Sequence, residues 1–258
     1  MAGNWVKFPH ADKAYVYDAA ALKKKWARLH KGDGEPFPKD AAVAAAWQAF
    51  HAGDFAEAVK AGKAAGGPGR NAAVKAQVVY AHYLEKTDKA KVALLEEAAG
   101  MADARRQEAP KDANAQYLYA FALGRYSQGI SVAKALAAGY GGKIRDALGT
   151  ALKLDPKHAE AHTAFGAYQA EVIDKIGGIV AGVTYGAKKD SAVEHYEKAL
   201  ALFPESAIAH IEYGNGLLML FGKSRIDAAT KLYEKAAALP PADAMERLDV
   251  ELAKSELE

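Results

Sequence analysis

Hydrophobic residues near the N-terminus recur at alternating spacings of four and three, the period of an amphipathic helix. The stripe consists of Tyr15, Ala19, Leu22, Trp26 and Leu29. Asp12 precedes the stripe as a start signal, and the glycine-containing turn at Gly32 follows it as a stop signal. The pattern therefore predicts a helix over about residues 12–30.

We interpret this helix, with the proline-containing extended segment after it, as an N-terminal cap and connector over residues 1–39. Its basic residues Lys13 and Lys23–Lys25 leave open a helix on a membrane surface. Basic clusters of this kind more commonly mark the solvated side of a helix.

A second stripe, made of Met245, Leu248 and Leu252, predicts a helix at the C-terminus. Residues 242–258 contain six acidic residues against two basic ones, so the outer face of this helix should be acidic. We interpret it as a C-terminal capping helix. The pattern also allows it to occupy the groove of a neighbouring molecule.

Between these ends a phrase recurs three times, beginning at Pro110, Pro156 and Pro204. Each copy has alanine three and five residues after the proline, an aromatic residue at nine and a small residue at ten. A proline ends one helix and precedes the next. The aromatic–small pair allows two helices to approach closely, because the ring fills the space beside a residue without a bulky side chain.

These residues resemble the tetratricopeptide repeat (TPR), a helix–turn–helix unit. Ala192, Tyr196, Ala199 and Pro204 have the family's spacing, and an earlier unit contains its Gly-Asp-aromatic turn at Gly53. The resemblance, the abundant alanine and the scarce strand-type runs predict an all-α fold. We expect a right-handed superhelix of stacked antiparallel helix pairs, with about five pairs over residues 40–241 and capping helices at residues 1–39 and 242–258.

Two of the expected repeats are too long. Successive prolines lie 46, 48 and 37 residues apart from Pro110 to Pro241, against about 34 in the family. The excess predicts insertions near residues 129–143 and 173–189, which should extend the first helix or add a short one and then break at Tyr-Gly. We expect their apolar residues to pack against each other. This set is Val132, Leu136, Ile176, Ile179, Val180 and Val183.

The second insertion is also similar to the regulator of microtubule dynamics group. Members of that group have a long apolar insert followed by an aromatic-Gly step before the second helix. Tyr185-Gly186 ahead of Ser191 fits this arrangement. Tubulin binding is not carried over to this chain.

In TPR proteins the first helix of each unit lines a concave groove that binds a peptide or protein partner. The resemblance places twelve residues in such a groove: Asn114, Tyr117, Phe121, Arg125, Glu160, Thr163, Glu171, Ile208, Ile211, Asn215, Leu218 and Met219. The last five are mostly apolar and could accept a helix or an extended apolar segment. Alternatively, the C-terminal helix or a second copy of the chain covers them.

The TPR subclass that grips a chaperone's C-terminal carboxylate is disfavoured. Lysine would be needed where Tyr117, Thr163 and Ile211 stand, and Asn215 alone fits.

Three short motifs suggest chemistry, and each lacks its context. Gly222-Lys223-Ser224 imitates the end of a phosphate loop, but no strand precedes it and the required earlier glycine is absent. His158 and His162 can share a helix face, but the glutamate between them is misplaced for a zinc protease. Ser131-Val-Ala-Lys134 has no companion acylation motifs. We therefore expect no catalytic residues, no metal and no cofactor.

Charge and cysteine content limit the classes of partner and of site that we expect. The net charge of +2 argues against nucleic acid. The chain has no cysteine, which excludes disulfides and thiolate sites and fits a cytoplasmic location. The first ten residues have no apolar stretch typical of a signal peptide, and no run is long enough for a transmembrane segment.

The pattern thus favours a non-catalytic helical-repeat scaffold that binds a protein or peptide partner of unknown identity, with self-association left open. One alternative is a carrier of a small ligand, with a pocket formed by the two insertions. The second alternative is an enzyme whose active site has no recognisable motif.

Overall fold

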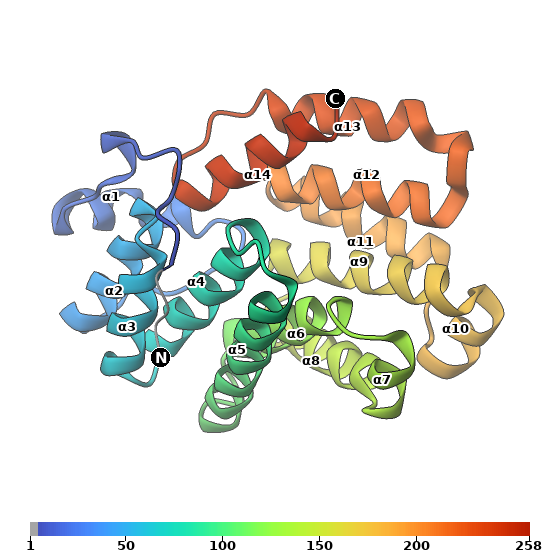
Figure 1. Cartoon of the computed structure of the whole chain (residues 1–258), viewed down its shortest axis with the longest axis horizontal. Coiled ribbons are helices and arrows are strands. Elements are labelled where there is room, and N and C mark those ends of the chain that lie inside the picture. The colour runs from blue at the N-terminus through green and yellow to red at the C-terminus, as the bar shows by residue number, and fades with distance from the viewer. Residues whose placement is uncertain (1–4) are drawn as a thin grey trace.

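The computed structural model describes residues 5–258, and the regular secondary structure of this part is all helical, as the sequence predicts (Figure 1). The N-terminal residues 1–4, which belong to the stretch tested for a signal peptide, lie outside the described part. A 3₁₀ turn (Lys13–Tyr15) leads to helix α1 (Ala19–Leu29). The helix was expected to begin near residue 12; it begins instead where the Asp18 side chain accepts from Ala21 N.

Five pairs of antiparallel helices follow. They are α2 (Ala41–Ala52) with α3 (Phe55–Ala65), α4 (Gly69–Tyr83) with α5 (Asp88–Glu108), α6 (Ala113–Gln128) with α8 (Tyr140–Leu154), α9 (Ala159–Ile176) with α11 (Lys189–Leu202), and α12 (Ala207–Phe221) with α13 (Ile226–Ala237). The first helices of successive pairs contact one another and form the inner layer of the solenoid. A 3₁₀ turn (Gly222–Arg225) joins the last pair.

The recurring proline phrase forms the entrance to three inner helices. The residue two positions after the proline caps the helix: Asp112, His158 or Ser206 accepts from a backbone N–H. The residue six positions after the proline bonds back to the proline carbonyl. Gln116 does so to Pro110 at 3.2 Å, His162 to Pro156 at 3.2 Å and His210 to Pro204 at 3.0 Å. The two histidines thus have a repeated structural role.

The aromatic–small pairs bring the helices of a repeat together as expected. A Cβ atom added at Gly166 would lie 2.9 Å from the Tyr196 ring. One added at Gly214 would lie 2.5 Å from the Tyr233 ring. Because real Cβ contacts are longer, only glycine fits beside these rings.

The two insertions form short helices, α7 (Val132–Ala137) and α10 (Gly178–Tyr185). The second breaks at Tyr-Gly as expected, with Gly186 in a left-handed conformation (φ 69°). In the first insertion the expected break is wrong, because Tyr140 begins α8.

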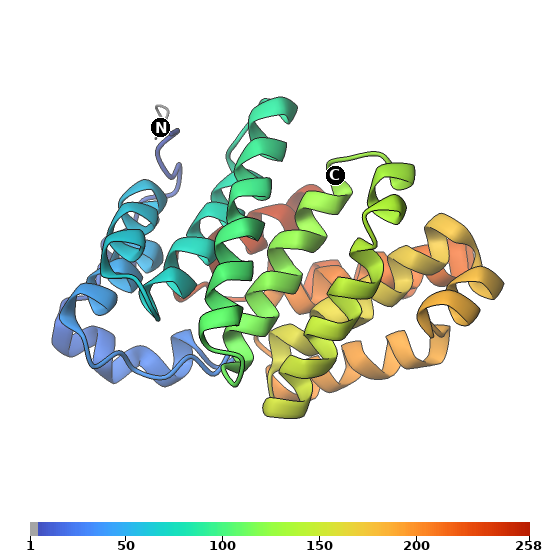
Figure 2. The ribbon, with the colours of Figure 1, turned by 90° about the horizontal axis from the view of Figure 1, so that it is seen from below.

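The expected packing of the insertions against each other is also wrong. Ile179 and Val183 are each 86% exposed, because α10 packs on α9 and α8 through its opposite face. Figure 2 shows α10 at the end of the molecule opposite α1.

Helix α14 (Ala244–Ser255) contacts α12, α13 and α2. It was expected to present an acidic outer face. Instead, three acidic residues in or next to α14 are buried: Asp243, Glu246 and Asp249. Each of them has a partner in the N-terminal half. His51 bonds to Asp243 at 2.7 Å, and Arg28 binds Glu246 at 2.6 and 3.0 Å. Helix α14 therefore ties the two ends of the solenoid together (Figure 1).

Candidate functional site

A cavity of about 240 Å³ lies on the concave side of the solenoid. Its walls come from the inner helices α4, α6, α9 and α12, from α7 and α8, from the C-terminal end of α10, and from α14. Seven residues predicted to line a groove lie here together: Tyr117, Phe121, Arg125, Glu160, Thr163, Glu171 and Ile208. The inner helices of at least three repeats therefore face one space.

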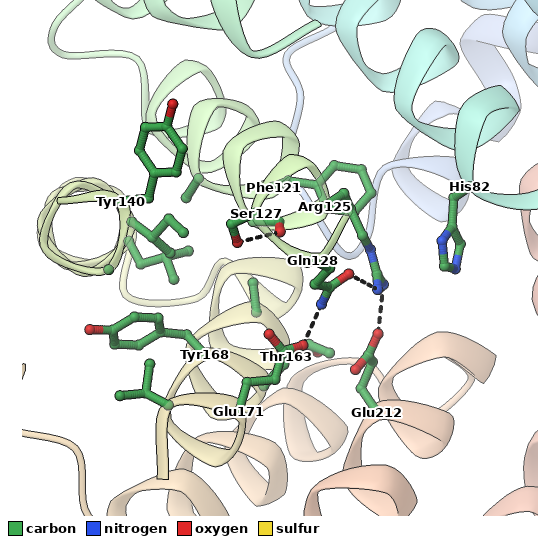
Figure 3. Close-up of a pocket in the computed structure, with 18 of the residues that line it drawn as sticks. His82, Phe121, Arg125, Ser127, Gln128, Tyr140, Thr163, Tyr168, Glu171 and Glu212 are labelled. Carbon is green, nitrogen blue, oxygen red and sulfur yellow. Dashed lines mark hydrogen bonds and ion pairs between the residues drawn. The ribbon is translucent and has the colours of Figure 1, made fainter. Parts of the chain in front are cut away.

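One part of the cavity is apolar and is built largely by the insertions and their neighbours. Its walls include Ile130, Val132, Leu136, Tyr140, Ile144, Tyr168, Val172, Ile176 and Tyr185. Figure 3 shows Tyr140 and Tyr168 on one side and Arg125, Glu212 and His82 on the other. An occupant would thus meet a hydrocarbon surface at one end and charged groups at the other.

Arg125 organises the polar end. Its guanidinium binds Glu212 at 2.6 Å and donates to the Gln128 side-chain oxygen at 3.2 Å. The Gln128 amide in turn donates to Glu171 (Figure 3). Burial, together with the nearby Glu212 charge, raises the pKa of Glu171 to about 7. These side chains are held in place before any ligand binds.

Three further groups at the polar end come from α4 and α14. The Tyr83 hydroxyl donates to Asp249, and burial raises the pKa of Asp249 to about 8. Burial, helped by Arg125 and Lys91, lowers the pKa of His82 to about 3, so this ring is neutral at physiological pH. Two of the polar groups are therefore poised to be uncharged at neutral pH.

A buried charged cluster centred on Lys75 forms part of the cavity wall through Lys75 and Glu160. Its ammonium binds Asp33 at 2.7 Å and Glu160 at 2.9 and 3.0 Å. Burial alone would raise the pKa of Asp33, but Lys75 and His30 hold it well below its usual range. The Gly32 carbonyl also accepts from Glu160 N at 3.0 Å. The connector after α1 is therefore inserted into the centre of the solenoid.

The other five predicted groove residues lie elsewhere. Asn114 donates to the buried carboxylate of Glu35, and Asn215 accepts from Tyr233 at 2.6 Å. Ile211 is 1% exposed and packs in a core with Val250 and Ala253 of α14. Leu218 is half-buried beside that core, and Met219 is 38% exposed. The C-terminal helix thus covers Ile211.

The family model for regulator of microtubule dynamics protein 1-3 matches residues 71–257. The chain belongs to this family. Every cavity-lining residue, from Lys75 to Asp249, lies within the matched part. The similarity noted at Tyr185-Gly186 is thus confirmed over a far longer stretch, whereas α1 to α3 precede the match.

A solved structure supports the fold of this family member. A thermophilic TPR protein of Thermus thermophilus has a TM-score of 0.57 at 16% identity, covering 83% of this chain and 97% of that one. The MamA protein is less similar in shape, with a TM-score of 0.37 at 21% identity over 84% of this chain and 93% of that one. No curated protein sequence matches the chain. The TPR-like helical solenoid predicted from the sequence is confirmed.

Several cavity residues of this family member escaped the sequence analysis. Lys75, His82 and Tyr83 belong to the degenerate second pair. They lie 7, 14 and 15 residues after Pro68, but this proline is not followed by the aromatic–small pair that marks the other units. Asp249 belongs to a helix expected to cap the end. Glu212 directly follows the predicted groove residue Ile211 but lies outside the spacing of the groove positions. A better indication of Asp249 is that acidic residues of an amphipathic C-terminal helix can be buried against partners elsewhere in the chain.

The histidines considered for a metal have other partners. His158 caps α9, accepting from Ala161 N at 3.1 Å, and His162 bonds to His195 at 2.8 Å. Within residues 5–258 no group of three His, Cys, Asp or Glu residues is arranged to hold a metal ion. No helix in this part of the chain is long and apolar enough to cross a bilayer.

Proposed function

We propose that the protein is a non-catalytic helical-repeat scaffold that holds a short apolar segment of a protein partner in the concave cavity. The observation that carries the proposal is the convergence of Tyr117, Phe121, Thr163 and Ile208 on that one space. These residues come from three successive inner helices, the elements that present binding residues in TPR proteins.

The form of the cavity supports a short segment. Helix α14 covers Ile211 and contributes Met245 and Asp249 to the wall, so an extended peptide cannot run along the whole inner layer. Arg125 is already fixed by Glu212 and Gln128. Fixed side chains lower the entropy lost on binding, which favours a partner that inserts a few apolar side chains.

Gly124 provides a test that spares the fold. It lies on α6 in the cavity wall, and a Cβ atom there would have nothing within 4 Å. Gly124→Leu should fill part of the cavity and abolish recovery of the partner from cells of the native host, measured by quantitative mass spectrometry. Gly149→Leu, on α8 with equal space at Cβ and outside the cavity, is the matched control. Equal recovery with both variants would contradict the proposal.

Tubulin is the first partner to test, because the family's description refers to microtubule dynamics. Co-sedimentation with microtubules should be retained by the Gly149→Leu control and lost with Gly124→Leu if tubulin occupies the cavity. The absence of cysteine supports a cytoplasmic location, where such a partner is available.

A small apolar ligand is the second candidate. Its support is that residues of both insertions, including Leu136 and Tyr185, line the same cavity. Native mass spectrometry of protein purified from cells would show a retained mass that Gly124→Leu removes. A wild-type protein with no added mass, alongside a partner lost on Gly124→Leu, would leave the scaffold as the function. Size-exclusion chromatography with light scattering would show whether the scaffold self-associates.

A further inference from the structure

Helix α10 presents an apolar face to solvent. Ile179 and Val183 are each 86% exposed, the highest values among the large hydrophobic residues that the structure describes as exposed, and Val180 is 52% exposed. Residues four positions apart share one face of a helix, so Ile179 and Val183 form a continuous patch. Scattered single apolar residues are ordinary on protein surfaces, whereas a contiguous patch marks an interaction site.

The helix is held firmly from behind. Ala181 is fully buried in a cluster with Ile173 of α9 and Ala187. Tyr185 at its C-terminal end lies against Gly141 of α8, where an added Cβ atom would come within 2.8 Å of the ring. The outward direction of Ile179 and Val183 is therefore fixed by the packing of the opposite face.

The two insertions and their flanks have a net positive charge. Helix α10 has no charged residue, and the exposed Lys175 and Lys188 lie three residues beyond its two ends. The two insertions and their immediate flanks, residues 129–146 and 173–190, contain six basic residues against three acidic ones. Asp174 lies 3.5 Å from Lys175 and Asp146 pairs with Arg145, while Asp190 is the third acid. Neither α7 nor α10 contains an acidic residue.

A second copy of the chain does not suit this surface. A specific protein interface buries about 800 Å² per partner, and three aliphatic side chains of an eight-residue helix supply a small part of that area. Two basic copies would also repel each other. A bilayer needs no such matched surface, because apolar side chains enter the boundary between headgroups and acyl chains while lysines approach lipid phosphates.

We propose that α10 docks the protein reversibly on an anionic membrane surface, with Ile179, Val180 and Val183 inserted and Lys175 and Lys188 facing the headgroups. The proposal does not depend on what the cavity binds, although Lys175 also lies in the cavity wall. A single small apolar element with a few basic residues gives weak, reversible attachment, since stable anchoring needs two strong signals.

A single fluorescent label tests the insertion, because the chain has no cysteine of its own. Full-length protein with Val183→Cys, labelled with an environment-sensitive dye, is mixed with phosphatidylcholine vesicles with or without phosphatidylserine. The emission should shift to the blue with the anionic vesicles and stay unchanged with the neutral ones. The same dye on Val16→Cys, 66% exposed and three residues before α1, should not shift with either.

Unlabelled variants test the same surface by vesicle co-sedimentation. Ile179→Asp with Val183→Asp should abolish binding to anionic vesicles at unchanged melting temperature, because both side chains are exposed. Lys175→Glu with Lys188→Glu should weaken binding by roughly tenfold or more. Ile226→Asp, at an exposed apolar position on α13, should bind as wild type.

Two outcomes overturn the proposal. One is vesicle binding that survives Ile179→Asp with Val183→Asp. The other is a blue shift of the Val183 label that rises with protein concentration in the absence of vesicles, which would assign the patch to a second copy.

Discussion

The glycines at the contacts between paired helices show which single-residue contacts could be predicted from the sequence. The aromatic–small pair predicted a close approach at Gly166 and Gly214, and the rings of Tyr196 and Tyr233 confirm it. The pair is readable because both partners recur at a fixed distance from a proline. The charge pairing of Lys75 could not be predicted in this way, since its partners Asp33 and Glu160 lie 42 and 85 residues away in the chain.

Replacing Gly214 by alanine should destabilise the protein by about 1–3 kcal/mol. The added methyl group would meet the Tyr233 ring, and that ring is fixed by the bond from its hydroxyl to Asn215. Gly149→Ala, where a Cβ atom has free space, should instead stabilise α8 by about 0.5–1 kcal/mol. Urea denaturation of both variants measures the two effects, and a neutral Gly214→Ala would contradict the tight contact.

Replacing Lys75 by methionine should cost about 3–5 kcal/mol, because it leaves the buried carboxylates of Asp33 and Glu160 without their cation. Lys60→Met is the control. Its ion pair with Glu57 is exposed, so the change should stay within about 0.5 kcal/mol. Chemical denaturation at neutral pH compares the two variants. Equal free energies of unfolding for Lys75→Met and Lys60→Met would show that the buried cluster does not stabilise the fold.

At the scale of helices, local signals predicted the repeated elements better than the added ones. Proline, a capping residue and an apolar stripe together define where α6, α9 and α12 begin. The short helices α7 and α10 lie within the two stretches that the excess length indicated. The exposure of α10 could not be predicted, because an apolar helix of eight residues has the same sequence pattern whether it faces a core or solvent. The inward acids of α14 depend on partners such as His51, which are distant in sequence.

Helix α14 should loosen as the pH rises. Burial raises the pKa of Asp249 to about 8 in the folded protein, against about 4 in the unfolded chain. Between these values only the folded state keeps the proton, so the contribution of Asp249 to stability falls from about pH 4 to about pH 8.

Asp249→Asn removes this effect while keeping an oxygen acceptor for the Tyr83 hydroxyl. The variant should be more stable than wild type at pH 9 by more than about 1 kcal/mol, and closer to it at pH 5. Thermal melts across this range give the comparison. Parallel pH profiles of variant and wild type would exclude the raised pKa.

At the scale of the whole molecule, α14 joins two parts of the core. Leu248 packs with the N-terminal cluster that contains Trp47, whereas Val250 and Ala253 pack with the C-terminal cluster that contains Tyr233. Repeat proteins without such a link lose cooperativity as nearest-neighbour contacts fail. This solenoid should therefore unfold in a single calorimetric transition.

Removing residues 243–258 should lower the melting temperature and separate the transition into two, because both clusters lose apolar contacts and Arg28, His51 and Tyr83 lose their partners. Removing only residues 256–258, which are exposed, should leave the melt unchanged. A truncated protein that still melts in one step at the wild-type temperature would show that α14 does not couple the two ends.

The bond between His51 and Asp243 also bears on how the chain matures during translation. The two residues are 192 positions apart, so at ordinary elongation rates roughly 10 to 40 s separate their synthesis. Throughout that interval the imidazole of His51 lacks the carboxylate of Asp243, and the guanidinium of Arg28 lacks that of Glu246. The first repeats leave the ribosome without the helix that closes them, and the final arrangement forms only after α14 has emerged.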